Sequence, residues 1–494
     1  MKNLKSFIAF MLIMTSVVQM NAQGEFSSFT ITGHGLGTVF ASDYQCLGIN
    51  PANTAVKYND KSKRFALGLG EGAFSLNSGV LTKKELVQNI FQSGFNSINR
   101  DQQLMYAQQF AQQTNTMDMD FMLIGASMNL GKLGAIGFSM RDRMDMYSKM
   151  GPEVAELIWL GSTASMFSDL IIETANGNYD TIPNSPGINA DTLAMVVQGI
   201  SNLSNSSVNS ILQGTKINFS WIREFNFNYS RPIVETDNWS LYGGVGVKLL
   251  RGQAMMSIVA ENNTTQAFAA FSPMFEIEMD SLSNPTSMSF TPKLSKMDPV
   301  GKGMAVDLGV TLKVKDTFFA SAAVTDIGGM NWNTNVYQFS NDTLSTLAYN
   351  GMQDVNLVNN LSQLSLGSNM LKWNGVSSFH TKMPATMRAG AAVMILDVVK
   401  VGFDAVAPLN REVSNLQKGM ISMGAEVKLP FNFRISGGVV KGGNYNTPRI
   451  TAGLTKSSLN GVYEWGIASR DIITYFSQNE PTVSMAVGFL RFKI

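Results

Sequence analysis

The stretch "GKGMAVDLGVTLKVKD", residues 301–316, decides the fold because its side chains alternate strictly in character. One face of this stretch is wholly apolar and consists of Met304, Val306, Leu308, Val310, Leu312 and Val314. The opposite face carries charged and hydroxyl groups, namely Asp307, Thr311, Lys313 and Lys315. A transmembrane β-strand needs about nine to eleven residues with one apolar face, and this stretch meets that requirement.

The same alternation recurs in stretches such as "KINFSW" (216–221), "KVGFDAV" (400–406) and "FNFRISGGVV" (431–440). The chain ends within another, "TVSMAVGFLRFKI" (482–494), whose apolar and aromatic character resembles the signal read by outer-membrane assembly machinery. Lipid offers no partner to an unpaired backbone group, so such strands can span a membrane only as a closed barrel. We therefore predict an all-β membrane protein with a single antiparallel transmembrane β-barrel.

The strand count follows from placing the C-terminus in the periplasm and treating short turns as periplasmic. About fourteen strands result, an even number as expected for bacterial barrels, and sixteen is the alternative. The segment "TQAFAAFSPMFEIEM" (265–279) would break this parity, so we assign it to an extracellular excursion. The barrel is expected over residues 64–494, with extracellular insertions at 77–118, 148–215, 259–302 and 332–384.

The insertions are expected to be helical. "TKKE" (82–85) is a capping-box pattern, and the apolar segments 153–172 and 190–203 are predicted to be helices. Insertions of this size carry function or cover a pore, although they can also simply pack on one another. They are a possible docking place for a protein partner. As a possible capture site for an apolar ligand we select Phe91, Phe95, Trp159 and Phe167.

Composition and targeting signals bound the class of protein. Lys2 and Lys5 precede the apolar run 7–18, and cleavage after Ala22 would remove residues 1–22 as a signal peptide. The net charge of +1 argues against a nucleic-acid partner. No later run of eighteen apolar residues predicts a membrane helix. Cys46 is the only cysteine, so no disulfide forms within the chain.

Residues 23–63 are poorly suited to a barrel wall. Closely spaced glycines make a strand irregular, and Pro51 removes a backbone donor and favours an extended Asn50. We predict a hatch inside the barrel. Its structural or gating residues are expected to be His34, Gly35, Gly37, Asn50, Pro51 and Ala52. Asn50-Pro51-Ala52 is expected to mark the place where hatch turns into wall.

Two families share short motifs with this chain. "EFSS" (25–28), "GHGLG" (33–37) and "NPAN" (50–53) resemble, in order, the N-terminal hatch of the long-chain fatty acid outer-membrane transporters. That resemblance implies a fourteen-stranded barrel with the hatch in its lumen. The insertions do not match those transporters, so their ligand-binding positions are not carried over.

The second resemblance runs along most of the mature chain. "VTDIGGMNWN" (324–333), "PATMRAGA" (384–391), "YEWGIASRDI" (463–472) and "GFLRFKI" (488–494) are similar to an uncharacterised barrel family common in Bacteroidota. Both resemblances imply the outer membrane of a Gram-negative bacterium, with outer-membrane lipid as a partner.

Charged residues on the inward register are expected in the lumen: Lys248, Asp307, Lys313, Arg388, Asp404, Glu426, Arg434 and Arg449. They form either a polar pathway or internal ion pairs and hatch contacts, of which we favour the second because buried charges persist only when paired. Arg223 falls on the apolar register, where a charge facing lipid costs roughly 2–4 kcal/mol at mid-membrane. A bulge would turn it inward. The resembled transporters use a strand kink as a side exit, so that resemblance makes this a candidate site, and ordinary irregularity of register is the alternative.

Catalytic and metal-binding patterns are missing from the sequence. The only two histidines are His34 and His380, and His380 has only Ser377 or Ser378 as a neighbouring nucleophile. We therefore expect no catalytic residues, no metal and no cofactor. The expected function is passive uptake of a small hydrophobic or amphipathic compound, with a barrel adaptor for secretion or surface attachment as the alternative.

Overall fold

The computed structural model describes residues 28–56, 63–82, 84–85, 97–201, 207–276, 278–279, 285–287, 293–341, 344–355, 372–396, 398–416, 418–443, 445–476 and 482–494. The predicted signal peptide 1–22 and the selected residues Phe91 and Phe95 lie outside the described residues. So do both ends of the predicted hatch, at 23–27 and 57–62.

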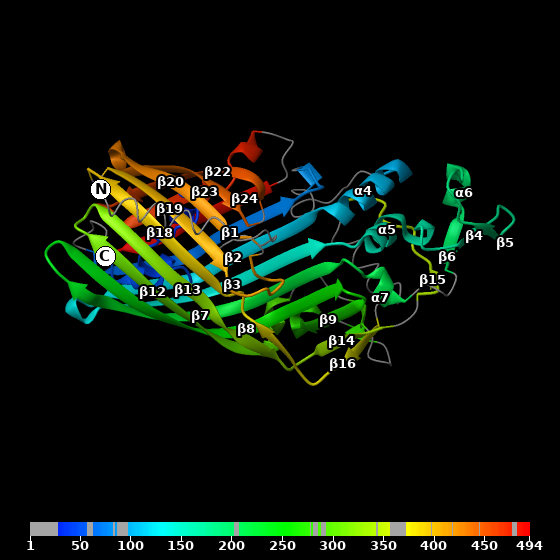
Figure 1. Cartoon of the computed structure of the whole chain (residues 1–494), viewed down its shortest axis with the longest axis horizontal. Helices are drawn as coiled ribbons and strands as arrows, with labels where there is room; N and C mark the ends of the chain where they lie inside the picture. Colours follow the sequence, from blue (N-terminus) through cyan, green and yellow to red (C-terminus); the bar gives the residue numbers. More distant parts are fainter. Residues whose placement is uncertain are drawn as a thin grey trace.

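Fourteen antiparallel strands form a closed ring, in which each strand pairs with the next and the last pairs with the first (Figure 1). The ring consists of β1 (Phe65–Ser78), β2 (Thr114–Asn129), β3 (Ala135–Lys149), β7 (Lys216–Glu235), β8 (Trp239–Glu261), β12 (Gly301–Val314), β13 (Phe318–Trp332), β18 (Thr386–Ile395), β19 (Val399–Pro408), β20 (Met420–Leu429), β21 (Phe433–Gly442), β22 (Tyr445–Ser458), β23 (Tyr463–Ser469) and β24 (Thr482–Lys493). The predicted transmembrane barrel of fourteen strands is confirmed. The closed ring leaves no strand edge exposed to lipid.

The ring is extended by a side sheet at its long-loop end. The first half of β8 pairs with β12, whereas Ala254–Glu261 pairs with β9 (Thr264–Phe271). Strands β14 (Val336–Ser340) and β16 (Lys372–Gly375) continue this sheet, and β17 (Phe379–Lys382) pairs with the end of β13. The parity argument was therefore right to keep 265–271 out of the ring.

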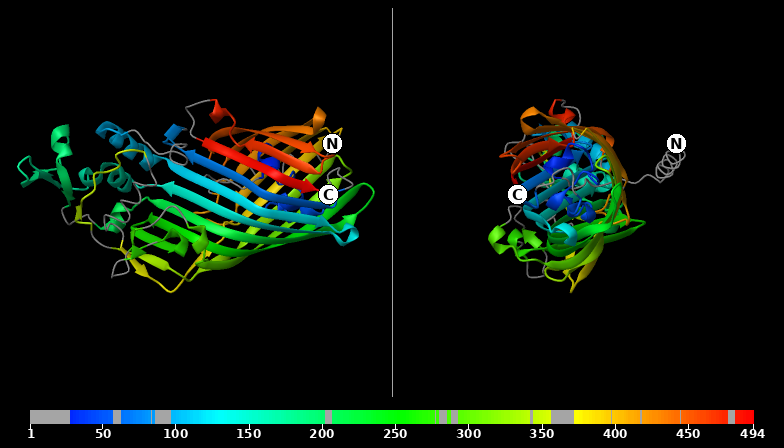
Figure 2. Two further views of the ribbon diagram at one scale, coloured as in Figure 1. Left: turned by 180° about the vertical axis from the view of Figure 1, so that it is seen from behind. Right: turned by 90° about the vertical axis from the view of Figure 1, so that its left-hand side faces the viewer.

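The long loops gather at one end of the barrel, opposite the short turns (Figures 1 and 2). Helices α4 (Arg100–Gln112) and α5 (Pro152–Leu160) pack together there, while α7 (Val208–Ile211) is shorter. The capping box is present, since the Thr82 nitrogen donates to Glu85 at 2.7 Å. Among the described residues, no helix has both the length and the apolar character needed to cross a membrane.

The predicted helices 153–172 and 190–203 form only in part. After α5 the chain enters β4 (Asp169–Glu173), and after α6 (Ala190–Ala194) it enters β6 (Val196–Ile200). With β5 (Tyr179–Pro183) and β15 (Thr346–Leu347) these strands make a small sheet. Short apolar runs do not distinguish strand from helix by periodicity, and here their β-branched residues pair with neighbouring strands.

The hatch lies inside the ring, as the view along the barrel shows (Figure 2). Three short helices divide it: α2 (Phe29–Thr32), η2 (Asp43–Cys46) and η3 (Pro51–Thr54). Helix α2 contacts β22, β23 and β24, η2 contacts β1, β2 and β3, and η3 contacts β7, β8 and β12. The hatch therefore spreads its contacts around the wall.

Glycines in the wall make room for the hatch. At nine of them an added Cβ would lie 2.1 to 2.7 Å from a hatch atom: Gly68, Gly125, Gly244, Gly309, Gly390, Gly402, Gly424, Gly466 and Gly488. Real Cβ atoms do not approach other heavy atoms this closely. Glycine in these strands thus marks the close approach of hatch side chains and, at Gly244 and Gly424, of hatch backbone.

The interpretation of Asn50-Pro51-Ala52 as the junction of hatch and wall needs correction. The wall begins only at Phe65, and Asn50 caps η3, accepting from the Ala52 nitrogen at 3.1 Å. Its Nδ2 also donates to Thr311 Oγ1 in β12 at 3.0 Å. The motif therefore holds the hatch against β12 of the wall, because Pro51 starts the short helix η3 beside that strand.

We predict that Gly244→Ala loosens the hatch. The new Cβ would lie 2.4 Å from the Ala52 nitrogen and from the Pro51 carbonyl carbon, and backbone atoms cannot rotate away. Cys46 reports the change, because it is the only cysteine and is fully buried. Maleimide labelling of the folded protein, read by intact mass, should be negligible for wild type and rapid for the variant.

Gly437→Ala is the matched control, since its Cβ would meet nothing nearer than Thr451 O at 3.7 Å. Each protein must shift its gel mobility on boiling, which shows a closed barrel. Equal labelling of the two variants would contradict the proposed seating of the hatch on Gly244.

Candidate functional site

A chamber of about 590 Å³ opens in the lumen on the long-loop side of the hatch. Its apolar walls include Ile222, Val259, Phe268, Trp332 and Phe379. The rings of Phe268 and Phe379 stack at a centroid distance of 3.8 Å, which joins β9 to β17 beside the chamber.

The rest of the chamber is polar. Hydroxyl and amide groups come from β7 and β8, and charged groups come from β3 and from the loop between β19 and β20. The polar residues include Arg143, Asp145, Asn218, Ser220, Ser257, Gln266, His380, Arg411 and Glu412. A lining of this kind suits an amphipathic molecule, because apolar walls supply area and a few polar groups fix orientation.

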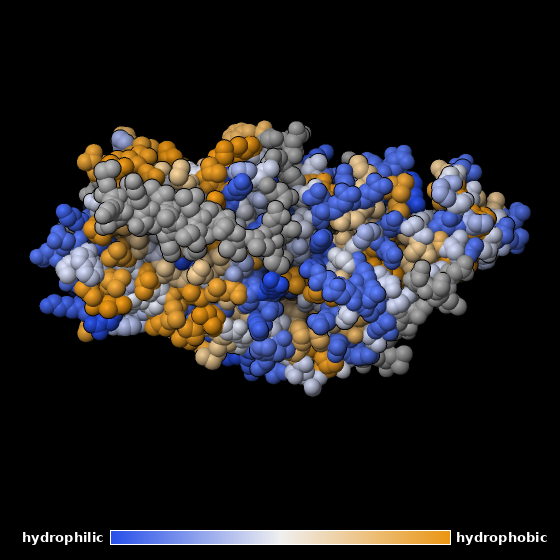
Figure 3. Space-filling view, viewed as in Figure 1, coloured by the Kyte–Doolittle hydropathy of each residue, from blue (hydrophilic) through white to orange (hydrophobic). Residues whose placement is uncertain are grey.

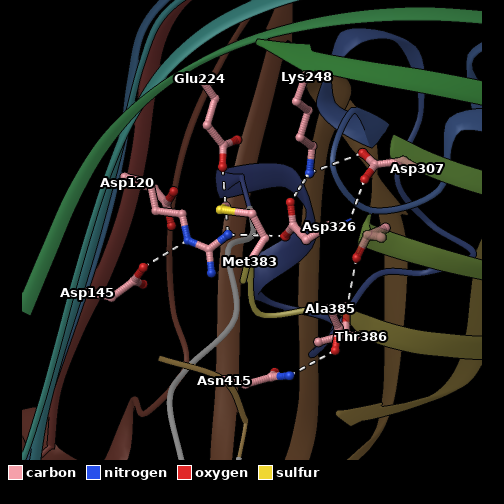
Figure 4. Close-up of polar contacts among 12 residues, drawn as sticks. Asp120, Asp145, Glu224, Lys248, Asp307, Asp326, Met383, Ala385, Thr386 and Asn415 are labelled. Carbon is pink, nitrogen blue, oxygen red and sulfur yellow. Dashed lines mark hydrogen bonds and ion pairs between the residues drawn. The ribbon is translucent and has the colours of Figure 1, made fainter. Parts of the chain in front are cut away.

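A buried charge network lies beneath the chamber. Lys248, with no exposed side-chain surface, contacts Asp307 at 3.1 Å and Asp326 at 2.6 Å (Figure 4). The Asp326 nitrogen donates to Asp307 Oδ1 at 2.8 Å, and Asp326 adopts a positive φ of 60°. This local break in β13 turns both carboxylates toward one ammonium group.

Two arginines of β3 extend the network. Arg143 contacts Asp145 at 3.0 Å, Asp326 at 3.2 Å and Glu224 at 3.7 Å. Arg141 contacts Glu224 at 2.6 Å. Figure 4 shows Asp145, Glu224 and Asp326 converging from different strands. The network therefore ties β3, β7, β8, β12 and β13 together across the lumen.

The loop at 409–416 folds into the lumen, which sequence reasoning missed. Asn415 is 1% exposed, and its Nδ2 donates to Ala385 O at 2.8 Å and to Asn410 Oδ1 at 2.6 Å. Leu416 joins an apolar cluster with hatch residue Leu36. A short polar loop carries no local signal for such burial, so only its tertiary partners reveal it.

Burial also affects the acid of this loop. Desolvation at the chamber rim raises the pKa of Glu412, and the nearby cations Lys382 and His380 oppose that rise. The ionisation of Glu412 therefore depends on the burial and the charges at the chamber rim.

Six of the expected lumen charges pair with charged residues elsewhere in the barrel or contact the hatch: Lys248, Asp307, Asp404, Glu426, Arg434 and Arg449. Arg434 pairs with Glu464 at 2.8 Å, and Arg449 with Asp471 at 3.3 Å. Arg388 is buried at the edge of a small polar cavity below the chamber. The eighth, Lys313, pairs with Asp316 at a short turn, away from the chamber. A role of this set in guiding a solute stays a prediction.

The hatch residues expected from sequence contact the wall. His34 Nε2 lies 3.4 Å from Glu426, and its ring stacks on Phe40 at 4.6 Å. The Gly37 nitrogen donates to Asp404 at 3.1 Å, and Gly35 takes a positive φ of 114° beside Ser422. These contacts support a structural role, whereas a gating role stays a prediction.

Trp159 and Phe167 lie in the core of the loop region. Trp159 is 0% exposed and stacks on Tyr106 at 4.6 Å, and Phe110 lies 5.2 Å away. Phe167 is equally buried. Their part in ligand capture stays untested, and this packing places them away from the chamber.

Arg223 is not turned inward as a bulge would have it. It lies on the outer face, where its Nε and Nη2 bind both oxygens of Asp142 at 2.8 and 2.7 Å. The irregularity lies in the pairing with β8, between Trp221 and Ile222.

Within the described part of the chain, no group of three or more His, Cys, Asp or Glu residues is placed to hold a metal ion.

We predict that Lys248→Met destabilises the barrel by about 3–5 kcal/mol, because it leaves the buried Asp307 without a counter-charge and Asp326 with Arg143 alone. The midpoint of unfolding in urea, followed by heat-dependent gel mobility, measures the loss. The deficit should shrink as pH falls, since protonated carboxyl groups need no ammonium partner. A loss of stability that does not change with pH would show that packing, and not charge, causes it.

Three comparisons relate this chain to known proteins. The comparison with curated proteins finds no match. Among solved structures, the toluene transporter TodX of Pseudomonas putida is similar at 9% identity and a TM-score of 0.41, with 96% of this chain and 99% of that chain covered. A FadL homologue of Pseudomonas aeruginosa is similar at 10% identity and a TM-score of 0.40, with 96% and 97% covered.

Both structures are of the transporter type that the N-terminal motifs resembled. With TM-scores below 0.5, we take nothing about function from them. The family comparison is more specific, because one model matches residues 183–457, more than half of the chain. The chain belongs to this family, DUF5723, a family of unknown function.

Proposed function

We propose that this protein is an outer-membrane barrel for the passive uptake of small hydrophobic or amphipathic compounds. The observation that supports this most directly is the chamber above the hatch. Its volume of about 590 Å³ falls within the ordinary range of roughly 300–1,000 Å³ for ligand pockets.

The lining gives each part of an amphipathic molecule a place. Phe268, Phe379 and Trp332 offer flat apolar surface, which favours aromatic or alkyl groups. Ser220 and Ser257 offer hydroxyl groups in the same lining, with Ser257 directly beside Phe268. A purely polar solute would gain little from the aromatic wall.

The lumen below the chamber is filled. The charge network and the hatch lie across it, and nine wall glycines bring wall and hatch into direct contact. An open water channel of the general porin kind is therefore not what this lumen provides. Passage requires the hatch or the wall beside the chamber to move.

The adaptor role stays the alternative, and one observation favours it. The sheet of β4, β5, β6 and β15 stands out from the barrel at the long-loop end (Figure 1). Strand β5 is its edge, and Tyr179 on it is 68% exposed. An exposed edge strand can accept a strand from a partner protein.

We predict that Ser257→Trp blocks uptake, because an indole side chain beside Phe268 would narrow the chamber. The measurement is the rate at which cells of a Gram-negative host take up N-phenyl-1-naphthylamine, an apolar dye that fluoresces only in an apolar environment. Cells with the wild-type protein should take it up faster than cells without it, and the variant should abolish that gain.

Ser377→Trp is the matched control, since Ser377 is exposed outside the chamber. It should leave uptake unchanged, and both variants should shift their gel mobility on boiling. Liposomes with the wild-type protein should not swell in arabinose. If wild-type cells gain no dye uptake, the adaptor role becomes the better explanation.

A further inference from the structure

A row of polar side chains crosses the outer face of the barrel. Each member is the register partner of the next on the adjacent strand. The row consists of Asp142 on β3, Arg223 on β7, Arg251 on β8, Lys302 on β12, Asn331 on β13 and His380 on β17.

The row carries a surplus of positive charge. Asp142 is bound by both donors of Arg223, which neutralises that pair. Arg251 and Lys302 stand directly opposite each other, and neither forms an ion pair with any described residue. Like charges directly opposite on neighbouring strands destabilise a sheet, so this pair favours binding of an anion.

The row lies at the depth of a lipid headgroup. From Lys302 to Val314, at the short-turn end of β12, the strand spans roughly 40 Å, or roughly 30 Å along the membrane normal at a tilt of about 40°. Between them Met304, Leu308 and Val310 face outward and are 57%, 50% and 45% exposed. On the face in view, hydrophobic residues gather over the strand half and give way to hydrophilic residues toward the long loops (Figure 3).

A groove of about 490 Å³ accompanies the row. Gly329 forms part of its wall, and the His380 ring lies against it, because a Cβ at Gly329 would come within 2.8 Å of His380 Cε1. Below the charges, Leu249 and Met304 are register partners and are both exposed. The groove is thus cationic at its top and apolar toward the membrane interior.

His380 and Asn331 border Arg251 and Lys302. His380 Nδ1 and Asn331 Oδ1 lie 2.7 Å apart. An amide oxygen only accepts, so Nδ1 donates and the Asn331 amino group stays available for another acceptor. Arg251 offers a planar fork of N–H donors, which matches phosphate oxygens in pairs.

We propose that this groove binds a phosphorylated lipid of the outer leaflet. Arg251 and Lys302 hold the phosphate, Asn331 donates to it, and an acyl chain lies along Leu249 and Met304. The vertical order of charge above apolar surface favours a lipid over free phosphate. This inference does not depend on the proposed uptake function.

The test uses the purified full-length protein in detergent micelles and lipid A as the probe, with native mass spectrometry to count bound molecules. We expect wild type to retain lipid A through delipidating detergent washes. The double variant Arg251→Ala with Lys302→Ala should bind it at least about tenfold more weakly, since it loses two charge-assisted contacts.

Lys441→Ala is the matched control, because Lys441 is also exposed near the long-loop end of its strand, on β21. It should retain lipid A like wild type, and Lys302→Arg should do so as well. Lipid A treated with phosphatase should bind the wild type as weakly as untreated lipid A binds the double variant. Inorganic phosphate at millimolar concentration should not displace the lipid.

The proposal is overturned by equal retention of lipid A in wild type and the double variant, by an equal loss of lipid A in Lys441→Ala, or by equal binding of dephosphorylated lipid. Displacement by inorganic phosphate would show an anion site without lipid selectivity and would also overturn it. If the double variant does not shift its gel mobility on boiling, Lys302→Gln alone serves in its place, since Lys302 is exposed.

Discussion

The close approach of the hatch to glycine positions in the wall is the constraint on which the rest of the structure depends. A backbone segment inside a barrel must satisfy its polar groups without water. At Gly244 and Gly424 the hatch comes within reach of the wall's Cα positions, and only hydrogen atoms fit between them. This contact fixes the depth of the hatch, and with it the floor of the chamber.

The charge network is the second consequence of a filled lumen. Lys248, Asp307 and Asp326 are buried so completely that each is tolerated only because the others are present. Such a set adds little stability over apolar residues of the same size. Its value here is specificity, because it joins strands β8, β12 and β13 in one register and separates the chamber from the hatch.

Cations on the inner and the outer face of the wall differ in whether the protein supplies their counter-charge. Inside, Lys248 finds carboxylates from the neighbouring strands of the same barrel. Outside, Arg251 and Lys302 face each other across a strand pair without one. Since the inner cations are satisfied by the protein, the outer pair is where the surroundings have to supply the counter-charge. A bilayer offers that charge at its headgroups and nowhere deeper.

The alternation of residues along the chain determined the barrel, because a period of two is a local property of a strand. Turn lengths and the even number of strands then gave fourteen and kept 265–271 out of the ring. Glycine and proline near Asn50 likewise marked a segment unfit for the wall. The wall partner of Asn50-Pro51-Ala52, the burial of Trp159 and the inward fold of Asn415 were decided only by tertiary structure. So was the meeting of Arg223, Arg251 and Lys302 in one row, because register between strands is set by pairing across loops of any length, and no pattern within a single strand encodes its neighbour's position.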